Sequence, residues 1–115
     1  MRDDKKNVII EKTFEFSLLI IDFAELLEEK RKYIVARQIL KSGTSIGANV
    51  REAQNAESND DFIHKMKVCL KELKETNHSL RLMEGYLQSS GSSAKEIKPM
   101  IQESQELIYI FYRSI

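Results

Sequence analysis

Apolar residues recur along this chain at steps of three and four, in four segments separated by short polar stretches. That spacing places the apolar side chains of each segment on one face of an α-helix. The pattern predicts helices over residues 8–30, 32–56, 59–88 and 94–114. The short β-branched runs lie inside these longer helical patterns, so they do not indicate strands. Long helices with short connections predict an all-α, antiparallel up-down-up-down four-helix bundle.

The apolar stripe of the first segment is unusually wide. Phe16, Leu19 and Phe23 define its main line, and Phe14, Leu18 and Ile21 widen it. A stripe of this width predicts contact with more than one neighbour, either inside the fold or in another subunit.

Local signals mark two of the three connections. Ser58 followed by Asp61 resembles a capping box with aspartate in place of the usual glutamate, so a helix should begin after a break at residues 57–59. The clearest loop covers residues 89–92, where Gly91 is a natural helix terminator. These signals predict short links around the third helix.

The start of the fourth helix has two alternatives. Ser93 and Glu96 match a capping box, which predicts a start near Ala94. Pro99 either kinks the first turns of such a helix or itself marks the true start at the first helical position. The sequence leaves both alternatives open.

Small residues concentrate in residues 41–53 of the second segment. Gly43 and Gly47 are four apart and share one helix face, and Ala48 follows them. Glycine in a helix interior costs about 1 kcal/mol relative to alanine. A helix that keeps two glycines is expected to need its backbone close to a neighbouring helix, so we interpret Gly43, Gly47 and Ala48 as a helix-packing seam.

Composition places the chain in a broad class. Its 115 residues predict one domain over 1–115, and one proline with four glycines favours long helices. The single cysteine, Cys69, excludes an internal disulfide and suits a reducing compartment. The first residues lack the pattern of a signal peptide, and no apolar run approaches the roughly 20 residues of a membrane span. We therefore expect a cytoplasmic protein without membrane contact.

Charge is balanced overall but uneven along the chain. With 18 basic and 18 acidic residues, the net charge is zero, which argues against a strong attraction of the whole protein to nucleic acid. Residues 30–51 nevertheless contain six basic and no acidic residues. This asymmetry indicates an anionic partner, or a solvated helix face paired with acids elsewhere in the bundle.

A second group of basic residues lies in the third segment. Lys67, Lys71, Lys74, His78 and Arg81 follow steps of four, three, four and three, so they form one stripe on the helix. A line of cations suits phosphate binding, although no aromatic residue is interleaved with it. The alternative is a solvated face that borders the core.

The two groups together supply the candidate RNA or DNA contacts, which are Arg37, Lys41, Arg51, Lys67, Lys71, Lys74 and Arg81.

Residues with catalytic or metal-binding chemistry are few. Glu75 and His78 match the Glu-x-x-His pattern of di-iron bundles, but such a site needs this pair on two helices. Both histidines, His64 and His78, lie in the third segment, so one helix would have to supply both halves. Cys69 lies on the apolar line, which indicates a buried thiol rather than a nucleophile. We expect no catalytic residue, metal or cofactor.

Residues of the second and third segments could form a polar network. Its candidates are Asn49, Glu52, Glu72 and Glu75. Asn49 borders the small-residue seam, so its amide should be partly buried and need a partner, for which Arg51 and Lys65 are available. We expect this network to be structural.

The motif Ser-Gly-Thr-Ser-Ile-Gly-Ala-Asn-Val-Arg-Glu-Ala at residues 42–53 carries a family resemblance. With Ser58-x-x-Asp61-Phe62 and Lys71-Glu72-x-x-Glu75-Thr76, it resembles the 23S rRNA intervening sequence family of four-helix bundle proteins. The likeness covers about residues 10–112. It implies an antiparallel bundle that forms a homopentamer shaped as a ring or barrel.

The chain is also similar to the accessory protein of diversity-generating retroelements, which binds nucleic acid and a reverse transcriptase. Our leading hypothesis is a non-enzymatic, self-assembling scaffold or adaptor with weak RNA binding. The alternatives are an accessory nucleic-acid-binding protein of a retroelement-like system, a metal-binding bundle, and a module that binds an unknown protein partner.

Overall fold

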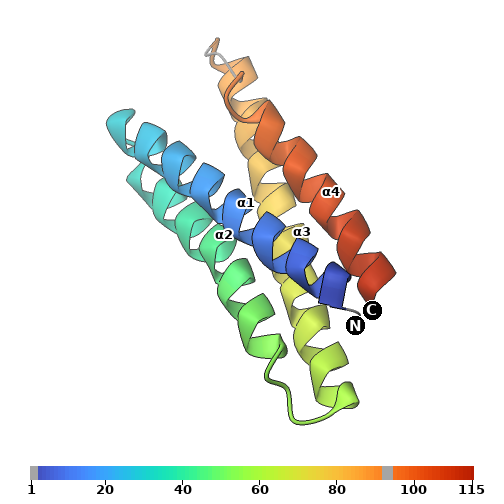
Figure 1. Cartoon of the computed structure of the whole chain (residues 1–115). Helices are drawn as coiled ribbons and strands as arrows, with labels where there is room; N and C mark the ends of the chain where they lie inside the picture. The colour runs from blue at the N-terminus through green and yellow to red at the C-terminus, as the bar shows by residue number, and fades with distance from the viewer. Residues whose placement is uncertain (1–2, 92–94) are drawn as a thin grey trace.

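The computed structural model describes residues 3–91 and 95–115 and confirms the predicted all-α four-helix bundle (Figure 1). Helix α1 spans Asp3–Glu29, α2 Tyr33–Ala53, α3 Asn59–Ser89 and α4 Lys98–Ser114. Each helix packs against its neighbours in chain order, and α4 closes the bundle against α1. Among the described residues, the backbones of the diagonal pairs α1–α3 and α2–α4 do not approach each other closely.

The helix ends differ from the predicted ones for identifiable reasons. Helix α1 begins at Asp3, and apolar periodicity cannot detect its first turn because residues 3–7 are all polar. Helix α2 ends at Ala53, and the N–H groups of residues 54–56 bond carbonyls three residues back, as in a tighter 3₁₀ turn. The Ser58 hydroxyl accepts a 3.0 Å hydrogen bond from the backbone N–H of Asp61, which confirms the predicted cap.

The predicted start of the fourth helix near Ala94 is wrong. Helix α4 begins at Lys98, with Pro99 within its first two positions, after a turn at residues 95–97. A helix from residue 94 would press the Pro99 ring against the carbonyl of Lys95, whereas proline is well tolerated in the first turn. Ser93, which the capping-box prediction used, lies outside the described residues.

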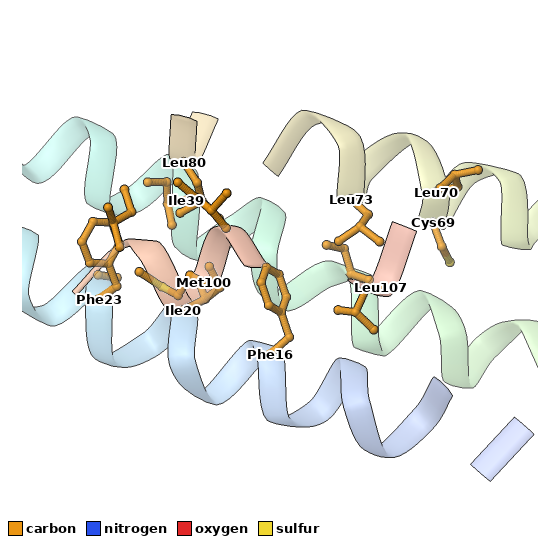
Figure 2. Close-up of a cluster of buried hydrophobic side chains, with 14 of the residues drawn as sticks. Phe16, Ile20, Phe23, Ile39, Cys69, Leu70, Leu73, Leu80, Met100 and Leu107 are labelled. Atoms are coloured by element: carbon orange, nitrogen blue, oxygen red, sulfur yellow. The ribbon is translucent and has the colours of Figure 1, made fainter. Parts of the chain in front are cut away.

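All four helices contribute to one core. Phe16, Ile20, Ile39, Leu73, Leu80 and Leu107 are among its fully buried side chains (Figure 2). Thr13, Thr76 and Ser104 are buried polar residues, and each hydroxyl donates a hydrogen bond to a carbonyl of the preceding helical turn. Bonds of this kind let polar residues occupy core positions without an unsatisfied donor.

The small residues of α2 approach α1 closely at one point. A Cβ atom at Gly43 would lie 2.8 Å from both Cγ atoms of Ile20, and the Ser17 hydroxyl donates to the Gly43 carbonyl at 3.3 Å. At Gly47 a Cβ atom would lie 3.5 Å from Ser17 Oγ, an ordinary contact. The structure places Ala48 outside this contact: it is exposed, because it lies about 100° around the helix from Gly47.

Replacing Gly43 with alanine should destabilise the bundle. The new methyl group would overpack against Ile20, at a cost of about 1–3 kcal/mol, and the better helix propensity of alanine offsets about 1 kcal/mol of this. We therefore expect a net loss of about 1 kcal/mol in the free energy of unfolding, measured by urea denaturation followed by circular dichroism.

Gly85 provides the matched control. It is exposed in α3, and a Cβ atom added there would have no heavy atom within 4 Å beyond its chain neighbours and the backbone of its own helix, so Gly85→Ala should gain up to about 1 kcal/mol. Equal stabilisation at both positions would show that Gly43 is not a packing requirement.

Candidate nucleic-acid interface

The cationic stripe of α3 lies on the outer surface of the bundle, and one of its members contacts α4. Its members, Lys67, Lys71, Lys74, His78 and Arg81, are all exposed. The Lys74 ammonium donates a hydrogen bond to the Tyr112 hydroxyl and lies 4.7 Å from the centre of its ring. Tyr112 belongs to α4, so Lys74 lies toward this helix.

Helix α4 places the Tyr112 ring against Lys74 of this stripe, and Tyr109 and Arg113 lie further around the exposed surface of α4. Tyr109 and Tyr112 are 62% and 56% exposed, and three residues apart they lie close together on the helix surface. The Arg113 guanidinium lies 5.5 Å from the centre of the Tyr109 ring. Sequence reasoning confined to α3 missed these rings, because Tyr112 is 38 residues from Lys74 in the chain. The one signal for them in the sequence is that both tyrosines fall off the apolar line of α4.

The stripe retains its positive charge. In residues 3–91 and 95–115, Lys65 pairs with Asp61 at 3.2 Å and Lys12 pairs with Glu106 at 3.0 Å, whereas no cation of the stripe forms an ion pair with an acid. Lysine and arginine heads in this state can approach phosphate oxygens without first breaking a salt bridge.

The candidate cations of α2 are exposed on a helix that packs against α1 and α3. Lys41 lies one turn before Ser45, which bonds Glu72 of α3, so Lys41 lies on the edge of α2 toward α3. Arg37 and Arg51 lie further around α2 from Ser45. Within the described residues, no hydrogen bond or ion pair joins any of the three to the stripe of α3.

The polar network links α2 to α3 through Glu72. Its two carboxylate oxygens accept hydrogen bonds from the Ser45 hydroxyl at 2.7 Å and the Asn49 amide at 2.5 Å. The partner of Asn49 is therefore Glu72, not Arg51 or Lys65. Both oxygens of the carboxylate are engaged in holding two helices together, which is a structural role.

The other polar-network candidates, Glu52 and Glu75, are exposed. Glu75 and His78 also carried the metal alternative, and both side chains are exposed to solvent. No three histidine, cysteine, aspartate or glutamate side chains gather into a potential metal site within the described part of the chain. The arrangement of these residues offers the metal alternative no support.

Cys69 lies in the core between α3 and its neighbours (Figure 2). Burial raises the pKa of its thiol from the ordinary 9.0 to about 12, and the nearby Glu72 carboxylate acts in the same direction. The thiolate is the reactive form of cysteine, so this environment suppresses nucleophilic chemistry.

Across the residues that the structure describes, none of the helices has a stretch apolar and long enough to span a membrane.

Comparisons with known proteins agree with the motif at residues 42–53. The model of the 23S rRNA-intervening sequence protein family matches residues 5–110. The bundle is similar to the 1.70 Å crystal structure of a protein of unknown function from the S23 ribosomal protein family of Bacteroides thetaiotaomicron VPI-5482. The TM-score is 0.85, the sequences are 34% identical, and the match covers 96% of each chain. No curated protein matches the sequence.

Native protein should resist thiol alkylation. With a pKa of about 12, about one Cys69 thiol in ten thousand is ionised at pH 8, and core packing blocks access to it. Mass spectrometry after iodoacetamide treatment should show no adduct on native protein and complete reaction in guanidinium. Rapid native alkylation would contradict the burial of this thiol.

The raised pKa of the Cys69 thiol also predicts how the free energy of unfolding changes with pH. The unfolded thiol ionises near its ordinary pKa of 9.0 and the folded thiol only near 12, so Cys69 should lower the free energy of unfolding as pH rises through that window. Comparison with Cys69→Ala across this pH range isolates the contribution of the thiol from that of lysine and tyrosine titration.

Proposed function

Since this chain belongs to the 23S rRNA-intervening sequence protein family, we propose that it acts in the cytoplasm as a non-enzymatic, self-assembling scaffold. The observation that carries the proposal is the outer face of α1. Phe14, Leu18 and Ile21 follow steps of four and three along this helix and are 58%, 49% and 38% exposed. Apolar side chains aligned in this way are stabilised when another surface removes them from water.

The family resemblance suggests five copies in a ring or barrel as the assembled form. Two groups with potential reactivity are held in ways that do not suit catalysis. Cys69 is buried and the pKa of its thiol is raised, and both carboxylate oxygens of Glu72 accept hydrogen bonds from α2. These environments support a structural role for both residues rather than a catalytic one.

A second candidate function is weak, sequence-independent binding of RNA or DNA. It is favoured by the stripe of α3, where cations without an acidic partner lie beside the exposed Tyr112 ring. Lysines would contact phosphates, which carry no sequence information, and the ring offers a stacking surface for an unpaired base. Several copies in one assembly would multiply a weak contact through avidity. An accessory role in a retroelement-like system would use the same surface.

The assembly proposal is tested by the absolute mass of the purified protein. Light scattering should give about five times the 13.4 kDa chain mass, because exclusion of the α1 face from water favours association. A mass of one chain would contradict the proposal. Absorbance at 260 and 280 nm across the same peak shows whether the assembly carries nucleic acid.

The nucleic-acid proposal is tested by charge reversal in the stripe. Lys71→Glu with Lys74→Glu should weaken binding to all single-stranded sequences alike, and the slope of log affinity against log salt should fall by about 0.7 for each phosphate that the protein no longer neutralises. Arg37→Glu with Arg51→Glu makes the same change of charge on α2, at positions turned away from α3, and should have a smaller effect. Equal weakening in both double variants would contradict the assignment to α3.

A further inference from the structure

A groove opens between the first turns of α2 and the last turns of α3. It has a volume of about 530 Å³ and is lined by residues 31–35 and 38, at and just before the start of α2, and by residues 79, 82, 83 and 86 of α3. In Figure 1 the α1–α2 pair diverges from the α3–α4 pair toward this end of the bundle. We refer to this feature as the α2–α3 groove.

The α2–α3 groove combines exposed apolar side chains with positive charge. Ile34 is 75% exposed, Leu82 62% and Tyr86 52%. The Lys32 ammonium lies 4.6 Å from the centre of the Tyr86 ring and donates to its hydroxyl at 3.2 Å, and Arg31 adds a second cation. None of the lining residues is acidic. These properties suit a partner surface that is apolar along its centre and acidic around it.

The outer face of α1 has these properties. Glu11, Phe14, Leu18, Ile21 and Glu25 follow one another at steps of three, four, three and four, so an acid lies at each end of a line of three apolar residues. All five are exposed. We refer to these residues as the α1 strip.

Charge and length also match between the two surfaces. Residues 8–29 contain six acidic residues and one lysine, and that lysine, Lys12, pairs with Glu106 of α4. The apolar part of the α1 strip, 14–21, and the α3 lining of the groove, 79–86, each span seven residue steps, which is about 10 Å along a helix.

We propose that the α1 strip of one copy docks in the α2–α3 groove of the next. This inference rests on the proposed self-assembly and identifies the surfaces that meet. Pairing a strip with a strip would bring acids together, and pairing a groove with a groove would bring Arg31 and Lys32 against their own copies. Opposite surfaces complement each other in both hydrophobicity and charge, which favours a head-to-tail contact.

The placement of the surfaces allows each copy to use both at once. Within the described residues the backbones of α1 and α3 do not approach each other closely, so the α1 strip and the α2–α3 groove lie on different sides of the bundle. A head-to-tail contact repeated from copy to copy closes into a ring or continues as a filament. The proposed ring is therefore the assembly that forms when this repeated contact closes on itself.

Two variants that each destroy one surface test the pairing. Leu18→Asp disables the α1 strip and Leu82→Asp disables the α2–α3 groove, and both positions are exposed, so the fold should persist by circular dichroism. Each variant alone should be monomeric by light scattering at 13.4 kDa. An equimolar mixture should form a one-to-one dimer of twice that mass, since each pair retains one intact strip and one intact groove.

The outcomes separate this inference from the assembly proposal. If the wild type assembles but the mixture of variants forms no dimer, the proposed pairing is overturned and self-assembly stands. The same conclusion follows if either variant alone still assembles. Monomeric wild type overturns both. Phe14→Asp and Ile34→Asp, at 58% and 75% exposed positions, repeat the test with independent side chains. Val68→Asp, at a 41% exposed position on α3 outside both surfaces, should assemble like wild type.

Discussion

The absence of a side chain at Gly43 is the constraint on which the arrangement of the first two helices depends. Ile20 occupies the space that a Cβ atom would need, and the Ser17 hydroxyl reaches across to the Gly43 carbonyl. Each contact requires the α1 and α2 backbones to be close. Glycine lowers the intrinsic stability of the α2 helix, and the close packing of Ile20 must offset this loss.

The small and polar residues of α2 serve two interfaces at once. Gly43 and Gly47 lie toward α1, whereas Ser45 and Asn49 lie toward α3 and hydrogen-bond to Glu72. One short motif therefore positions the second helix against both of its neighbours. The hydrogen bonds to a carboxylate are charge-assisted and directional, so they fix the register of α2 against α3, which the non-directional attraction of the core does not.

Charge is segregated by surface in this neutral chain. The outer face of α1 is acidic, the first turns of α2 are basic, and α3 carries a cationic stripe beside Tyr112 of α4. Net charge conceals this pattern because opposite surfaces cancel in the total. Such segregation sets which surfaces of two molecules attract, through complementary potentials that depend on salt.

The sequence by itself determined the helices and most of their inward faces, because helical periodicity and capping are local properties. Leu19, on the predicted main line of the first helix, is instead 37% exposed, because packing decides which residues at the edge of a wide stripe are buried. The apolar line through Phe16, the burial of Cys69 and the cap at Ser58 all follow from residues within a few turns. The ambiguity at Pro99 was also local, and its position in the first turn of α4 resolved it.

Only the tertiary structure decided which surfaces meet. The pairing of Asn49 with Glu72 and the Tyr112 ring beside Lys74 depend on how each helix is rotated against its neighbours. That rotation is set by packing between residues distant in sequence, which no local pattern contains. Periodicity gives the face on which a side chain lies, and packing alone supplies its neighbour.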